Sequence, residues 1–211
     1  QGLRDIKHPP LVRYGKGKLA ALQQAWDRGL AVVGSRKTTL YGQKAAENLV
    51  RSAANAGWVI VSGLARGIDT VAHRTTVDGG GRTIAVLGGG LDQVFPPENI
   101  PLAANLCDTG CVVTEQPMNM RPDRQTFPMR NRIIAALCPA TLVVEAGRNS
   151  GSLITAEKAV EFGRKVFAVP GRIDSPQSMG CNDLIRDGAC LTASLDDRSE
   201  ERRVGKECAT G

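Results

Sequence analysis

Residues 30–69 read LAVVGSRKTTLYGQKAAENLVRSAANAGWVIVSGLARGID. This stretch opens with a short apolar run, Leu30–Val33, and a second run, Trp58–Val61, lies near its end. Between the two runs, from Ala46 to Ala53, apolar residues recur at the spacing of one face of an α-helix. A strand, a helix and a further strand in this order form the unit that joins parallel strands. The stretch therefore predicts an α/β fold.

Further apolar runs of the same kind, bounded by Gly, Ser, Pro or Asn, occur at Thr83–Leu87, Cys111–Thr114, Thr141–Val144 and Val166–Val169. Runs that are apolar on both faces are typical of parallel strands covered by helices. Helical spacing recurs at Leu153, Ala156 and Val160, and over the shorter segments Leu102–Leu106 and Ile133–Leu137. This alternation, over about 140 residues, predicts a doubly wound α/β domain.

The composition excludes several classes of protein. The 211 residues fit one domain, and with 42% apolar but only 4% aromatic residues the core must consist of Ala, Val, Leu and Ile. No apolar run approaches the ~20 residues that cross a bilayer, so we expect no membrane association. Six Cys without a C-x-x-C pair and two His favour thiols in a reducing cytosol over disulfides or a metal site.

The chain divides into three parts. We interpret residues 1–29 as an approach segment, 30–197 as the α/β domain and 198–211 as a non-native tail. The tail includes RSEERRVGKEC at 198–208, which resembles the translation of a sequencing adapter. It holds four basic and three acidic residues, so removing it changes 27 basic and 21 acidic residues to 23 and 18, and +6 to +5. The remaining basic excess suggests an anionic partner.

Turns that suit anions follow several of the predicted strands. They include Gly34-Ser35-Arg36-Lys37, the pair Ser62-Gly63 and the turn Ser150-Gly151-Ser152, which precedes a helix. The carboxyl ends of parallel strands meet at one edge of the sheet, where ligands bind, and helix N-termini attract anions. Each turn alone is also consistent with an ordinary loop or helix cap, but several on one edge favour an anion site.

Residues 124–132 read RQTFPMRNR. Arg124, Arg130 and Arg132 surround Phe127 and Asn131 in this stretch. Arginines hold phosphates, and an aromatic face stacks on an unpaired base with ~1–3 kcal/mol per base. The stretch therefore suggests a site for single-stranded nucleic acid. The alternative is that Phe127 belongs to the core and that the arginines pair with acids.

The sequence gives weaker support to catalysis. Asp69 and His73 lie one helical turn apart and could activate Ser62, but no G-x-S-x-G elbow is present, which favours a structural pair. Gly88-Gly89-Gly90-Leu91-Asp92-Gln93 approximates the dinucleotide motif G-x-G-x-x-G, but Gln93 replaces the last glycine. The motif also follows the third predicted strand instead of the first. We expect no cofactor, no metal and no catalytic residue.

Taken in order, the motifs resemble those of the DNA-processing protein A family, also called Smf. The resemblance runs from about residue 3 to residue 195. It rests on VVGSR at 32–36, SGLARGID at 62–69 with His73, TIAVLGGGLDQVFPPEN at 83–99, FPMRNRIIA at 127–135, LVVEA at 142–146, SGSLITA at 150–156 and VFAVPG at 166–171.

The resemblance implies an extended Rossmann-like domain, with a doubly wound, mostly parallel sheet and helices on both faces. It implies a cytoplasmic homodimer that binds single-stranded DNA without base specificity, protects incoming DNA and helps load RecA recombinase in natural transformation. It also implies that the family's N-terminal helical module is mostly missing and that its C-terminal winged-helix module was lost at the adapter junction.

The family's DNA pocket matches Arg36, Arg124 and Phe127, and its motif positions include Arg130, Asn131 and the turn 150–152. With the residues suggested by the turns, the candidate DNA contacts are Arg36, Lys37, Gly63, Arg124, Phe127, Arg130, Asn131, Arg132, Ser150, Gly151 and Ser152.

The competing hypothesis is an enzyme. Related Rossmann-like proteins cleave the N-glycosidic bond of nucleoside monophosphates with a Glu beside a P-G-G-x-G-T turn. Glu115 and Glu145 lie near strand ends, but Pro170-Gly171 is followed by Arg172, so the turn is missing. We therefore expect a binding protein and not a hydrolase.

Overall fold

The computed structural model describes residues 3, 6, 9–10 and 14–194. The predicted tail, residues 198–211, lies outside the described residues, as does most of the segment that precedes Tyr14.

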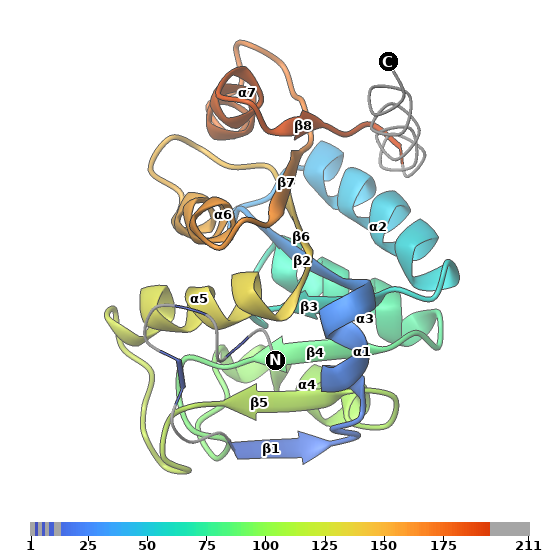
Figure 1. The fold of residues 1–211 in the computed structure, drawn as a ribbon, viewed down its shortest axis with the longest axis vertical. Coiled ribbons are helices and arrows are strands. Elements are labelled where there is room, and N and C mark those ends of the chain that lie inside the picture. The colour runs from blue at the N-terminus through green and yellow to red at the C-terminus, as the bar shows by residue number, and fades with distance from the viewer. Residues whose placement is uncertain (1–2, 4–5, 7–8, 11–13, 195–211) are drawn as a thin grey trace, which may run out of the picture.

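The described residues form one eight-stranded sheet in the order β1-β5-β4-β3-β2-β6-β7-β8 (Figure 1). All neighbouring strands are parallel except β1 and β5. The six predicted runs are all strands: β2 (Gly29–Gly34), β3 (Val59–Ser62), β4 (Thr83–Val86), β5 (Cys111–Thr114), β6 (Ala140–Val144) and β7 (Lys165–Ala168). The strand order reverses between β2 and β6, which confirms the doubly wound, mostly parallel fold.

The two edges of the sheet were not predicted. At one edge β1 (Tyr14–Gly17) pairs antiparallel with β5, and at the other β8 (Cys190–Leu191) pairs with β7. All four residues of β1 are exposed, so the strand has no apolar run that the sequence could reveal. The helix that follows it, α1 (Ala21–Arg28), buries Ala21 and Ala25 against the sheet. The described part of the approach segment thus belongs to the same domain.

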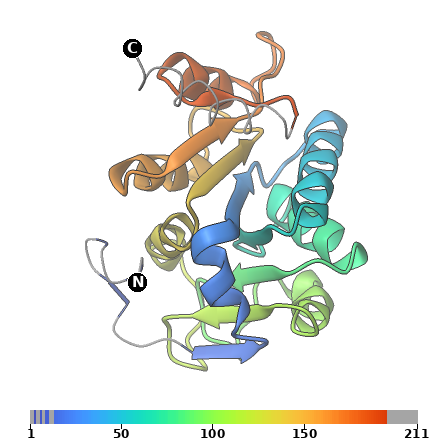
Figure 2. The ribbon, with the colours of Figure 1, turned by 45° about the vertical axis from the view of Figure 1, so that its right-hand side comes forward.

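Helices cover both faces of the sheet (Figure 2). One face carries α1, α5 (Thr126–Leu137), α6 (Gly151–Glu161) and α7 (Met179–Arg186), and the other carries α2 (Leu40–Asn55), α3 (Ile68–Asp78) and α4 (Ile100–Leu106). Along β2 the side chains alternate, since Leu30 and Val32 pack toward α2 while Ala31 and Val33 pack toward α5. None of the described helices has the length and apolar character needed to cross a bilayer.

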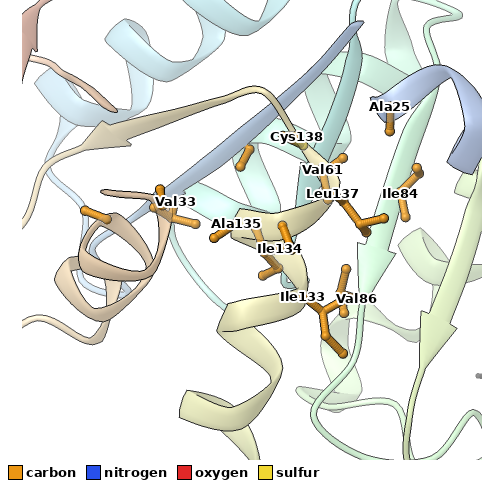
Figure 3. Packing of buried hydrophobic residues seen from close by; sticks show 14 of the residues in the cluster. Ala25, Val33, Val61, Ile84, Val86, Ile133, Ile134, Ala135, Leu137 and Cys138 are labelled. Carbon is orange, nitrogen blue, oxygen red and sulfur yellow. The ribbon is translucent and has the colours of Figure 1, made fainter. Parts of the chain in front are cut away.

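Helix α5 is anchored in the core at its C-terminal half. Ile133, Ile134 and Leu137 are buried in the same cluster as Val61 and Val86 of the central strands (Figure 3). The helix begins at Thr126, well before the predicted segment. Its first two turns, TFPMRNR, mix polar and apolar residues without an apolar period, so the sequence pattern does not reveal them. These turns bring residues of the RQTFPMRNR stretch to the carboxyl ends of the strands.

His73 links α3 to the sheet. Its Nδ1 lies 2.7 Å from Thr83 Oγ1, which donates its proton to the carbonyl of Ile60 at 2.8 Å. The hydroxyl has only one proton, so His73 Nδ1–H must be the donor, and Nε2 is a buried acceptor without a partner among the described residues. Burial, and secondly the charge of Arg130, lower the pKa of His73 to about 3. His73 is therefore neutral in the folded protein.

This buried neutral imidazole predicts a pH dependence of stability. Below its ordinary pKa of about 6.5, His73 binds a proton in the unfolded chain that it does not bind in the folded one. As the pH is lowered from about 6 to about 4, the free energy of unfolding should therefore decrease in both proteins or in the wild type alone, and the decrease should be steeper in the wild type than in His73→Gln. The difference between the two slopes should be ~1.4 kcal/mol per pH unit. Urea denaturation of both proteins measures the two slopes, and parallel slopes would contradict the assignment.

Candidate nucleic-acid interface

A cleft of about 770 Å³ opens at the carboxyl ends of β2 and β6, where the strand order reverses. This is the place where ligands bind in open α/β sheets. Its walls come from the turns after β2 and β6, from the N-terminal parts of α5 and α6, and from the loop before α7. Nine of the eleven candidate residues line it: Arg36, Lys37, Arg124, Phe127, Arg130, Asn131, Ser150, Gly151 and Ser152.

The cleft is positively charged. Its described lining includes five basic residues, of which Arg36, Lys37, Arg124 and Arg148 are exposed. Asp69 is the only acid among the described lining residues, and it is buried. The exposed surface of the cleft therefore favours an anionic ligand.

Arg36 and Phe127 form the aromatic part of the cleft. The guanidinium carbon of Arg36 lies 5.1 Å from the centre of the Phe127 ring, which is a cation–π distance. The ring is only half-buried, and it packs closely on Gly88, where a Cβ would lie 3.0 Å from it. Glycine at this position thus makes room for the ring, which explains part of the Gly88-Gly89-Gly90 motif without a dinucleotide.

Glu145 anchors the loop that carries Arg36. Its carbonyl accepts a hydrogen bond from Ser35 N at 2.7 Å. Its carboxylate accepts bonds from Thr38 Oγ1 at 2.7 Å, from Thr39 N at 2.8 Å and from the Thr39 hydroxyl. Glu145 is buried and has a φ of 52°, a left-handed conformation that residues other than Gly rarely adopt. The sequence indicates Glu145 only as a possible catalytic group and carries no signal for this anchoring role.

The opposite wall of the cleft is the N-terminus of α6. Ser150 caps the helix, since its Oγ accepts a bond from Ser152 N at 3.4 Å. Asn131 Nδ2 donates to the Gly151 carbonyl at 3.2 Å and thereby joins α5 to this turn. A Cβ on Gly151 would meet nothing within 4 Å, so the helix end is open to a ligand. Thr155, which sequence reasoning missed, is buried beside it and also lines the cleft.

Arg130 forms part of the cleft wall but is almost entirely buried, with 4% of its surface exposed. Its Nη1 donates to the Val86 carbonyl, and a Cβ on Gly63 would collide with the guanidinium. Burial lowers the pKa of Arg130 to about 10, Asp69 opposes this shift, and Arg36 adds to it. Arg130 thus stays charged at neutral pH and forms part of the wall mainly as a structural support. Gly63 packs against the guanidinium of Arg130 and does not line the cleft.

Arg132 is the other candidate that the structure does not bring to the cleft. Its guanidinium forms an ion pair with Glu115, and both side chains are largely buried. For Arg132 the alternative interpretation, in which the arginine pairs with an acid, is therefore confirmed. The pair also occupies Glu115, one of the two carboxylates considered for a hydrolase.

The possible triad of Ser62, Asp69 and His73 is not formed. Ser62 Oγ donates to the Val32 carbonyl at 2.6 Å, and His73 pairs with Thr83. Asp69 Oδ2 instead accepts the backbone N–H of Gly63 at 3.1 Å, which closes the turn after β3. Burial raises the pKa of Asp69, although Arg130 opposes the shift. The expected pair of Asp69 and His73 is wrong as well: both residues are buried, but each bonds to a different part of the fold.

Most of the chain is similar in sequence to known proteins. The family model described as DNA recombination-mediator protein A matches residues 1–203. DNA processing protein DprA of Bacillus subtilis is 41% identical over 199 residues, which are 94% of this chain and 66% of that protein. Protein Smf of Escherichia coli is 43% identical over 197 residues, 93% of this chain and 52% of that protein. The chain thus spans about half to two thirds of the length of these relatives.

Solved structures agree with this relationship. The X-ray structure of DNA processing protein A from Streptococcus pneumoniae has a TM-score of 0.89 and 43% identity, and covers 95% of this chain and 69% of its own. DNA processing protein A from Helicobacter pylori is described as having a unique single-stranded DNA binding mode. It has a TM-score of 0.85 and 26% identity, and the match covers 98% of this chain and 93% of the Helicobacter pylori chain. A molybdenum cofactor binding protein from Rippkaea orientalis, with a TM-score of 0.57 and 17% identity over 83% of this chain and 94% of its own, shares the fold alone.

The anchor at Glu145 leads to a stability prediction. Glu145→Ala removes the acceptor for Thr38 and Thr39 and leaves a Cβ in the left-handed conformation, so it should lower the free energy of unfolding by ~1–3 kcal/mol. Glu145→Gly loses the same bonds but tolerates the positive φ, so it should be more stable than Glu145→Ala by about 1 kcal/mol.

Urea denaturation measures the order of the variants, and Glu157→Ala, an exposed change on α6, is the matched control with an expected effect within ~0.5 kcal/mol. An alanine variant as stable as the wild type would show that Glu145 is not an anchor.

Proposed function

The chain belongs to the DNA recombination-mediator protein A family, and we propose that its cleft binds single-stranded DNA without regard to base sequence. The observation that carries the proposal is the half-buried Phe127 ring with Arg36 5.1 Å from its centre, inside a positively charged cleft. The described binding mode of the Helicobacter pylori protein, which matches 98% of this chain, supports it.

In this proposal both walls of the cleft hold phosphates, and the aromatic ring between them holds a base. Arg36, Lys37 and Arg124 are exposed and hold phosphates, and the open N-terminus of α6 accepts a further phosphate at Gly151. Phe127 stacks on a base. Only an unpaired strand exposes the faces of its bases, so the site prefers single strands to duplex, and every base has such a face.

We also propose that the cleft acts by binding alone. The two carboxylates considered for glycosidic cleavage are both engaged, Glu115 with Arg132 and Glu145 with Thr38 and Thr39. A carboxylate in these bonds is poorly placed to attack a substrate or to activate a water molecule.

The wider role rests on the family and on the charge of the cleft. We propose that the domain acts in the cytoplasm on incoming DNA during natural transformation, works as a homodimer, protects the strand and helps to load RecA recombinase.

The first test of the function compares DNA binding by the wild type with DNA binding by Arg36→Ala. We expect the wild type to bind single-stranded oligo(dT) more tightly than duplex of the same length at low and at high salt. Arg36→Ala should weaken binding to every single-stranded sequence by a similar factor and reduce the salt slope by ~0.7, the value of one lost phosphate contact on a single strand. Gel shifts and fluorescence anisotropy at several salt concentrations measure both quantities.

Arg51→Ala is the matched control, because Arg51 is exposed on α2 and lies outside the lining of the cleft. Equal affinity of the wild type for single strand and duplex would overturn the proposed function. Unchanged binding by Arg36→Ala alone would remove that residue from the interface.

Phe127 should act through stacking and not through charge. Phe127→Ala should weaken binding of single-stranded DNA by ~1–3 kcal/mol and leave the salt slope close to that of the wild type. Phe127→Trp should restore most of the affinity, because it restores an aromatic face. A changed slope with unchanged affinity at low salt would contradict the stacking role.

A further inference from the structure

A second aromatic ring lies just outside the cleft. Phe95 follows β4 in the loop that leads to η1 (Pro97–Asn99), and 43% of its surface is exposed. The centre of its ring lies 6.0 Å from that of Phe127, and the two ring planes are tilted by 49°. Phe95 is absent from the lining of the cleft, so the two rings lead from the cleft onto the outer surface.

An arginine accompanies this second ring as well. The guanidinium of Arg66 lies 6.0 Å from the centre of the Phe95 ring and forms an exposed ion pair with Glu98. Arg36, Phe127, Phe95 and Arg66 thus make a continuous row of contacts, which we call the aromatic strip. Only the first two members of the strip belong to the cleft.

The outer half of the strip is held in place by buried contacts. Asn99 is buried, and its Nδ2 donates to the Leu64 carbonyl at 2.9 Å and to Thr70 Oγ1 at 2.8 Å. These bonds join the segment after Phe95 to the turn that carries Arg66. The ring is therefore presented on a fixed support, which reduces the entropy lost when a ligand binds.

The start of the same loop is fixed independently. Gly90 N donates to the Met120 carbonyl at 2.8 Å, and Asp92 N donates to the Met118 carbonyl at 2.9 Å. Side chains on Gly89 and Gly90 would collide with this neighbouring segment, so the glycines permit the close approach. Both ends of the loop are thus bound, and yet Phe95 in its middle stays exposed.

We propose that Phe95 stacks on the base next to the one held by Phe127, so that an unpaired strand leaves the cleft across the aromatic strip. Two rings tilted by 49° cannot lie flat against one base, so each ring serves its own base. Arg66 lies beside this path, against the Phe95 ring and in its ion pair with Glu98. The inference rests on the proposed function and extends the binding site beyond the cleft.

The first experiment uses oligonucleotide length. Phe95→Leu keeps an apolar side chain against Phe127 but removes the flat face. It should bind oligo(dT) of about 12 nucleotides at least about fivefold more weakly than the wild type, and oligo(dT) of about 4 nucleotides almost equally well. Phe95→Tyr should restore the affinity for the long oligonucleotide. Tyr14→Leu on the edge strand β1, outside the cleft lining and the aromatic strip, is the matched control and should leave both affinities unchanged.

The second experiment reports on stacking directly. In Phe95→Trp, titration with the long oligo(dT) should quench the fluorescence of the new tryptophan, because an aromatic side chain stacked on a base is quenched. Tyr14→Trp serves as the control and should show no added quenching. The quenching should be weak with the short oligonucleotide, which does not reach the outer half of the strip.

The outcomes separate this inference from the proposed function. Wild-type affinity of Phe95→Leu for the long oligonucleotide, while Phe127→Ala binds weakly, would overturn the extension and leave the cleft proposal standing. Equal weakening by Phe95→Leu at both lengths would also overturn it, since Phe95 would then act within the cleft. Failure of the folded wild-type chain to bind any oligonucleotide would overturn both.

Discussion

The bonds that Glu145 makes at the end of β6 hold the wall of the cleft that carries Arg36. Its carbonyl and its carboxylate hold the two ends of the loop 35–39, which carries Arg36. The residues that follow Glu145 lead directly into the opposite wall at Ser150. One residue at the point where the strand order reverses thus fixes one wall and begins the segment that leads to the other. The left-handed backbone of Glu145 is tolerated because these bonds offset its conformational energy.

Burial gives the arginines of this domain three different roles. Arg36 is exposed and faces an aromatic ring, so its charge is available to a ligand. Arg130 is buried and bonded to a backbone carbonyl, so it shapes the wall of the cleft. Arg132 is neutralised by Glu115. The number of arginines near the cleft therefore overestimates the number of cations that can meet a phosphate there.

The sequence predicted the central strands and most of the cleft because parallel strands bring their terminal turns to one edge. The prediction for Arg132 is wrong because residues 124–132 look like one basic stretch in the sequence. From Thr126 the chain is helical, so Phe127, Arg130 and Asn131 share a face, while Arg132, five residues after Phe127, points elsewhere. The anchoring role of Glu145 had no sequence signal, since it depends on contacts with residues more than one hundred positions away.

A site that accepts any base has few ways to raise its affinity. It cannot use hydrogen bonds to base edges, because these would favour particular bases. It gains affinity by adding phosphate contacts and stacking faces along the strand, each of them indifferent to sequence. The rigid supports of Phe127 and Phe95, on Gly88 and through Asn99, suit this requirement. In the proposed complex the ordering entropy falls mainly on the DNA, and each further fixed contact along its path contributes to affinity without further ordering of the protein.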